Sequence, residues 1–159
     1  MSVLSWNRTT SKMEYINVAL EIYKETLAFT SRLSARYART LGNRINDLAA
    51  QLAEEVEKGN SIYPNSDDAK RQRKWHLREA RGALMALGVQ LTMAYRILSE
   101  SPEDAMCKRR KHNADGTRSG PQPMERGEAL EKLDKMAERL GLMLDRENEL
   151  LKGAISAVK

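Results

Sequence analysis

The sequence predicts an all-α fold in which a single domain, residues 1–159, forms an up-down-up-down four-helix bundle. Four separate segments repeat apolar residues at alternating spacings of three and four, the spacing of one face of an α-helix. Charged residues make up 31% of the chain and aromatic residues only 5%, which suits helices better than sheets. Two short turns and one long segment connect the helical segments, as this topology requires, and no segment carries a β-strand signal.

A loose N-terminal arm, residues 1–11, is expected to precede the first helix. Ser11 is the expected N-cap residue, because Glu14 follows it at the spacing of a capping box. The main apolar stripe of this helix consists of Met13, Ile16, Leu20, Tyr23 and Leu27. A second row, which predicts a second buried contact, consists of Tyr15, Val18, Ile22 and Phe29.

The second helix is expected within residues 36–63, with Ser34 as its cap and a stop at Gly59 and Asn60. Its apolar stripe consists of Leu41, Ile45, Leu48, Leu52 and Val56. Thr40 and Gly42 lie beside this stripe, and their small side chains would let another helix approach closely.

The third helix has the most regular spacing in the chain and follows a turn at residues 63–68 that is rich in capping residues. Its stripe consists of Leu77, Ala80, Leu84, Leu87, Leu91, Ala94 and Leu98. A three-four alternation kept over about three heptads predicts packing of the coiled-coil type. Further apolar residues off this stripe are Ala83, Met85, Val89 and Met93.

Residues 100–124 break the helical pattern and are expected to form a mobile, basic loop. Proline and glycine punctuate this segment, and residues 108–111 are four consecutive basic residues. The fourth helix is expected to begin within residues 124–128, with Glu147 as a polar interruption of its stripe. That stripe consists of Leu130, Leu133, Ala137, Leu140, Leu144, Leu151, Ala154 and Val158. A neighbouring apolar row consists of Met136, Met143, Leu150 and Ile155.

The doubled apolar rows of helices one and four predict self-association. A monomeric bundle needs one apolar stripe on each helix, so additional apolar width indicates an interface between subunits.

Basic residues are the strongest functional signal, in a chain with 27 basic residues, 22 acidic residues and a formal net charge of +5. Guanidinium groups can fork onto phosphates and stack on unpaired bases, so clustered arginines indicate nucleic-acid binding. A solvated face with salt bridges is the alternative explanation. The candidate nucleic-acid-binding residues are Arg36, Arg39, Arg44, Lys70, Arg71, Arg73, Lys74, Arg78 and Arg81. Trp75 lies among them and is expected to plug a seam between helices, with a base-stacking platform as the alternative.

The sequence lacks the patterns of an enzyme, and we expect neither catalysis nor a cofactor or metal site. His76 and His112 lie on different elements, and His76 is expected on a helix surface; no P-loop, nucleophile elbow or di-iron motif is present. Cys107 is the single cysteine, which is typical of a reducing cytoplasm. No apolar run approaches the roughly 20 residues of a membrane span. A cytoplasmic protein without membrane contact is therefore expected.

One motif carries a family resemblance. The order R-Y-x-x-T-L-G-x-R-I-x-x-L-A at residues 36–49 is followed by an acidic helix and then by G-N-x-I-Y at residues 59–63. This order resembles a small bacterial four-helix-bundle family. The family contains the accessory variability determinant (Avd) of diversity-generating retroelements and the protein encoded in ribosomal RNA intervening sequences. The resemblance covers residues 13–159, apart from residues 108–124.

The resemblance implies a non-catalytic accessory subunit. Avd-like proteins assemble as a pentameric barrel, bind a reverse transcriptase and its template RNA, and are required for the mutagenic cDNA synthesis that diversifies a target gene. By this resemblance the chain is a homopentamer in which Arg36, Arg39 and Arg44, inside the matching motif, hold RNA. Two alternatives stay open: a helical scaffold that binds a protein partner without nucleic acid, and a relative of the intervening-sequence protein, whose role is obscure.

Overall fold

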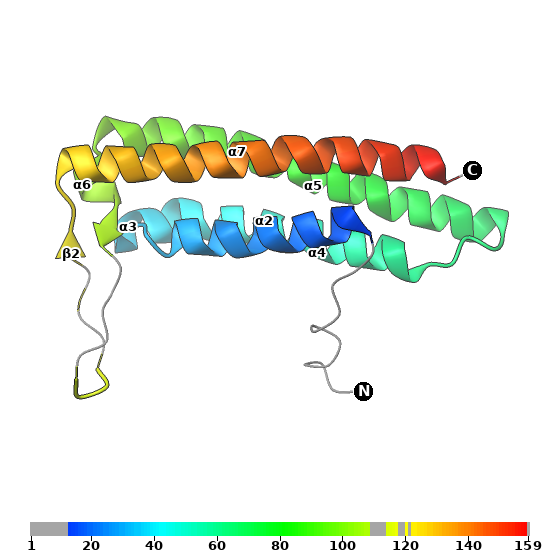
Figure 1. Ribbon diagram of the computed structural model, residues 1–159, viewed down its shortest axis with the longest axis horizontal. Coiled ribbons are helices and arrows are strands. Elements are labelled where there is room, and N and C mark those ends of the chain that lie inside the picture. Colours follow the sequence, from blue (N-terminus) through cyan, green and yellow to red (C-terminus); the bar gives the residue numbers. More distant parts are fainter. Residues whose placement is uncertain (1–12, 109–113, 118–119, 121, 159) are drawn as a thin grey trace.

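The computed structural model describes residues 13–108, 114–117, 120 and 122–158, and they form an all-α structure. Long helices lie side by side along the longest axis of the molecule (Figure 1). They are α2 (Glu14–Thr30), α4 (Asn43–Ser61), α5 (Asp67–Glu100) and α7 (Arg126–Ala157). Helix α4 packs against α2 and α5, and α7 packs against the same two helices. The expected arm at residues 1–11, the Ser11 cap, His112 and residues 109–111 of the basic run lie outside the described residues.

The face of α2 that packs against the other helices differs from the predicted stripe. Met13, Leu20 and Leu27 are 46%, 47% and 41% exposed, so the stripe prediction is wrong for these three residues. The buried side chains are Tyr15, Ile16, Ala19, Ile22, Thr26, Phe29 and Thr30. Both apolar rows have helical spacing, and periodicity alone does not select the one that α4 and α7 cover.

The second helical stretch is continuous but contains a π-helical turn. Helix α3 (Ala35–Tyr37) leads into the π-helix η1 (Ala38–Gly42), which leads into α4. Gly42 is buried, and a Cβ placed there would lie 3.6 Å from the Cβ of Thr30, so α2 does approach closely at this glycine. Thr40 is exposed, and its Oγ1 donates a 3.0 Å hydrogen bond to the carbonyl of Arg36.

Helix α5 begins and packs largely as its sequence predicts. The Ser66 side chain accepts a 3.2 Å hydrogen bond from the backbone N–H of Ala69, and two aspartates in the first turn complement the helix dipole. Six of the seven stripe residues are buried, and Leu91 is half-buried against the same core.

The connection between α5 and α7 is a packed structure in its described part, so the expectation of a loop over residues 100–124 is wrong there. It contains α6 (Pro102–Ala105) and two short antiparallel strands, β1 (Cys107–Lys108) and β2 (Gln122–Pro123). Met106 is fully buried. The Ser34 N–H donates to the Ala105 carbonyl, and the Cys107 N–H donates to the Arg32 carbonyl, each at 2.8 Å. Elements of two to four residues leave no periodic pattern in a sequence.

Helix α7 buries Leu133, Leu140 and Leu151 of its predicted stripe, and also the residue that interrupts it. The remaining stripe residues are half-buried. Glu147 is 0% exposed, like Leu133 and Leu151. The second apolar row, Met136, Met143, Leu150 and Ile155, is partly buried against the same core. Packing within one chain therefore already explains part of the apolar width of this helix. None of the helices in the described part of the chain combines the length and the apolar character needed to cross a membrane.

Candidate nucleic-acid interface

The basic residues predicted on α5 occupy two different settings. Arg73 points inward: its Nη1 donates to the Ile62 carbonyl at 3.1 Å, and its Nη2 donates to the Tyr15 hydroxyl at 3.4 Å. Arg81 reaches α7, where its Nε donates to Asn148 Oδ1 at 2.9 Å. These two guanidinium groups tie α5 to its neighbours, so they are less available to a ligand than the sequence pattern indicates.

The other basic side chains of α5 lie on or near the surface. Lys70 and Arg71 form ion pairs with the first-turn aspartates, at 3.4 Å to Asp67 and 3.5 Å to Asp68. These acidic partners are exposed, and exposed pairs of this kind contribute little and exchange readily for other anions.

Lys74 and Arg78 differ from them, because neither forms an ion pair within the described residues. Arg78 is exposed and Lys74 half-buried. The α5 basic face, defined here as Arg71, Lys74, Trp75 and Arg78, therefore carries uncompensated positive charge.

Trp75 is the unexpected member of the α5 basic face. Its side chain is 55% exposed, so the expectation that it plugs a seam between helices is wrong for this chain. Its ring contacts the His76 imidazole edge to face, with centroids 4.8 Å apart and planes at 72°. An exposed indole on a helix turn that also carries basic residues is an arrangement that can stack unpaired bases while the cations bind phosphates.

Sequence reasoning missed a hydrogen-bonded group of side chains beside this indole, formed by Glu55, His76 and Lys58. His76 Nδ1 lies 2.7 Å from Glu55 Oε2, and Lys58 Nζ donates to Glu55 Oε1 at 2.6 Å. Burial acts to raise the pKa of Glu55, but the hydrogen bonds from His76 and Lys58 outweigh it and lower that pKa. His76 is thus half-buried between α4 and α5 and not a plain surface residue. Glu55 and His76 lie on different helices, so no spacing in the sequence links them.

Helix α3, with which the family-like motif begins, lies at the opposite end of the molecule from the start of α5 (Figure 1). Arg36, Arg39 and Arg44 are all exposed; the Arg36 guanidinium lies 5.7 Å from the Tyr37 ring centroid, and Arg39 Nε donates to the Ala35 carbonyl at 3.1 Å. The start of α3 lies beside α6, and α6 comes directly after the C-terminal end of α5. The α5 basic face lies at the opposite end of α5, in its first turns. At about 1.5 Å per residue, Arg36 and Lys74 are separated by about 40 Å along α5. The structure does not bring the two predicted clusters together.

A carboxyl group with an altered pKa lies inside the protein. Glu147 is fully buried, and within the part of the chain that the structure describes neither of its carboxylate oxygens has a hydrogen-bond partner. Burial, and secondarily the charge of Glu14, raises the pKa of Glu147 to about 9. This carboxyl is therefore neutral in the folded protein at pH 7. Among the described residues, no three His, Cys, Asp or Glu side chains gather closely enough to hold a metal ion.

Comparisons of the chain with protein-family models, with curated proteins and with solved structures gave no match.

Proposed function

We propose that the protein is a non-catalytic RNA-binding accessory subunit that uses the α5 basic face. One observation carries this proposal: Trp75 is 55% exposed between Lys74 and Arg78, which have no ion-pair partners among the described residues. Stacking on an indole needs a base that is not paired, so single-stranded RNA is the ligand that this combination favours.

The family resemblance gives this binding a role. In that role the protein binds a retroelement reverse transcriptase in the cytoplasm and presents the template RNA, while the polymerase carries out mutagenic cDNA synthesis. We propose the up-down-up-down four-helix bundle as the topology of the domain. This proposal is supported by the packing of α4 and α7 on the same two helices, α2 and α5, which is the neighbour relation of a square bundle.

The test separates charge from stacking in RNA binding. Changing Lys74 and Arg78 together to Gln keeps length and helix propensity but removes two phosphate contacts. The affinity for a single-stranded RNA should fall, and the slope of log affinity against log salt should become shallower by about 1.4, at about 0.7 per contact. Trp75→Ala should weaken binding about 5- to 150-fold, from about 1–3 kcal/mol of lost stacking, and leave the salt slope unchanged.

The matched control removes two charges elsewhere. Lys24 and Lys152 are exposed and pair with glutamates on their own helices, at 3.0 Å and 2.6 Å. Changing both to Gln should leave affinity and slope nearly as in the parent protein. Filter binding across a salt series gives both quantities, and circular dichroism checks the fold. Folded variants of the α5 basic face that bind with unchanged affinity and slope would exclude this face and leave Arg36, Arg39 and Arg44 as the candidates.

A protein-binding scaffold without nucleic acid is the second candidate, and one apolar surface favours it. Every fourth residue along the exposed side of α5 is apolar, a set that we name the α5 apolar row. The row consists of Met85, Val89, Met93 and Ile97, which are 54%, 60%, 47% and 38% exposed. Half-exposed apolar residues in one line indicate a surface that another protein covers.

The same row is the best-supported surface for self-association. The expectation of self-association rested on doubled rows in helices one and four, and the pentamer on the family resemblance, but the second row of α7 is partly buried. On the described helices, α5 supplies the longest exposed row, starting about one turn beyond Arg81. We therefore propose that subunits meet through the C-terminal half of α5 and leave its N-terminal half to RNA.

A further inference from the structure

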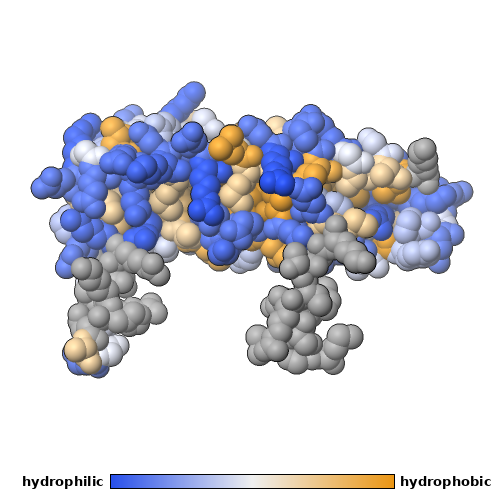
Figure 2. Space-filling model, viewed as in Figure 1, coloured by the Kyte–Doolittle hydropathy of each residue, from blue (hydrophilic) through white to orange (hydrophobic). Residues whose placement is uncertain are grey.

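A cleft of about 510 Å³ lies between α2 and α7, away from the α5 basic face. Its apolar wall is formed by Ala28, Met136 and Leu140. Figure 2 shows the face on which α2 and α7 lie, with hydrophobic patches between hydrophilic side chains. The volume is in the range of about 300–1,000 Å³ typical of sites for small organic ligands.

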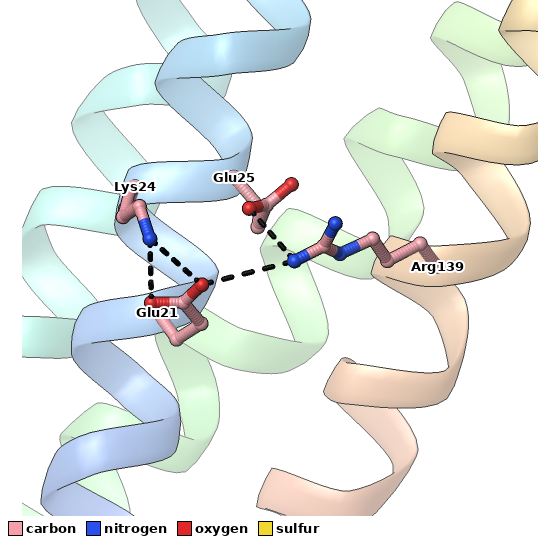
Figure 3. Close-up of polar contacts among 4 residues, drawn as sticks. All are labelled: Glu21, Lys24, Glu25 and Arg139. Atoms are coloured by element: carbon pink, nitrogen blue, oxygen red, sulfur yellow. Dashed lines mark hydrogen bonds and ion pairs between the residues drawn. The ribbon is translucent and has the colours of Figure 1, made fainter.

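Most of the charges that line this cleft already have partners. Arg139 of α7 reaches across to α2, where its Nη2 lies 3.0 Å from Glu25 Oε1 and 3.8 Å from Glu21 Oε1 (Figure 3). Glu21 also accepts a hydrogen bond from Lys24 Nζ at 3.0 Å. The other carboxylates of the cleft are paired as well: Glu131 with Lys135 at 2.5 Å and Glu128 with Lys108 at 3.3 Å.

Two cations of the cleft remain uncompensated. Arg32 and Lys132 line it, and neither forms an ion pair with any residue that the structure describes. The Nη1 atom of Arg32 is buried and has no hydrogen-bond partner among the described residues. A guanidinium nitrogen removed from water without an acceptor is unfavourable, so the charge of Arg32 is not compensated within the described residues. The cleft thus has two spare positive charges next to an apolar wall.

We propose that this cleft binds a phosphate monoester. A monoester carries about −1.5 to −2 charges at pH 7, which matches Arg32 and Lys132 together, whereas a carboxylate matches only one of them. Phosphate oxygens accept the paired N–H groups of a guanidinium, and a lysine ammonium can neutralise the remaining charge. The organic group of the ester lies against Ala28, Met136 and Leu140.

The test uses phenyl phosphate as the probe and benzoate as the singly charged comparison, titrated calorimetrically at constant ionic strength. Phenyl phosphate should bind one site per chain, raise the melting temperature and be displaced by inorganic phosphate. Its affinity should exceed that of benzoate and should fall below about pH 6, where the second phosphate proton returns. Arg32→Gln and Lys132→Gln should each weaken binding at least about tenfold, because each removes a charge-assisted contact.

Lys152→Gln is the matched control, since it removes a cation of the same helix outside the cleft. Circular dichroism checks each fold, and Lys132→Gln, a surface change, tests the site independently of any structural role of Arg32. Saturable binding that both cleft variants weaken and the control retains supports the site. Absence of saturable binding, equal affinity for benzoate, or equal binding by all variants overturns it.

The source of the monoester can be a small molecule or the end of an RNA strand. Short RNAs with and without a 5′-phosphate separate these sources. If RNA with a 5′-phosphate binds the parent protein more tightly than RNA without it, and the cleft variants lose this difference, the site binds RNA ends. Phenyl phosphate binding without that gain assigns it to a free ester.

Discussion

Glu147→Gln should stabilise the protein at neutral pH, because Glu147 is neutral in the folded state. The pKa of this carboxyl is about 9 in the folded protein, against 4.5 as its ordinary value in water. Between these two values the folded protein holds a proton that the unfolded chain releases. The free energy of unfolding is therefore highest below pH 4.5, where both states hold the proton. It falls progressively as the pH rises toward about 9.

The size of the effect follows from that window. Each pH unit inside it lowers the free energy of unfolding by about 1.36 kcal/mol. Neutral pH lies about 2.5 units above 4.5, so ionisation of the unfolded chain lowers stability by about 3.4 kcal/mol at pH 7. Glutamine has the same shape, stays neutral and has no such loss. The gain of Glu147→Gln should therefore be about 3 kcal/mol larger at pH 7 than at pH 4, or about 6–12 °C in melting temperature.

Urea and thermal denaturation followed by circular dichroism between pH 4 and pH 8.5 measure this gain. Glu149→Gln is the control, because Glu149 lies on the same helix, is 68% exposed and pairs with Lys152. Its effect should stay within about 0.5 kcal/mol at every pH. A Glu147→Gln variant whose stability follows the same pH curve as the parent would refute the reasoning, since the folded carboxylate would then be charged and paired.

Two further predictions concern packing. In light scattering the parent protein should have a mass several times 18.0 kDa, with five chains expected from the family resemblance. Met93→Glu places a charge in the α5 apolar row and should convert this assembly to a helical monomer. Leu20→Glu on α2, also at a residue 47% exposed, is the control that should leave the mass unchanged; a monomeric parent protein would contradict self-association. Met106→Ala should lower the free energy of unfolding by about 2–5 kcal/mol because Met106 is fully buried, whereas Met85→Ala should change it by less than about 0.5 kcal/mol. Equal effects of these two changes in chemical denaturation would mean that the connection between α5 and α7 contributes no core.

The sequence predicted the buried face well where one apolar row is longer and more regular than the other apolar residues of the helix. On α5, Leu77 to Leu98 follow a single spacing, and the buried face agrees with it. On α2, two rows compete, and only the packing of other helices selects the buried one. The polar interruption at Glu147 was visible in the sequence, but its complete burial depends on residues far away along the chain.

The candidate site was less predictable for the same reason. Nine basic residues could be named, yet Arg73 turns inward only because Ile62 and Tyr15 provide acceptors for its guanidinium. The contact of Glu55 with His76, and the lack of an ion pair for Arg32 among the described residues, likewise depend on three-dimensional packing. Spacing along one helix cannot reveal a partner on another helix.

The order in which the helices pack has a consequence for folding kinetics. Helices α4 and α5 are joined by the short connection 62–66, so their contacts close a small loop and can form early. The contact of α2 with α7 joins Glu14 to Arg146, which are 132 positions apart, and must close nearly the whole chain. This seam is expected to form after the rate-limiting step, so changes to it alter the rate of unfolding more than the rate of folding. A ligand bound in the cleft between α2 and α7 would then lower the rate of unfolding and lengthen the lifetime of the folded state.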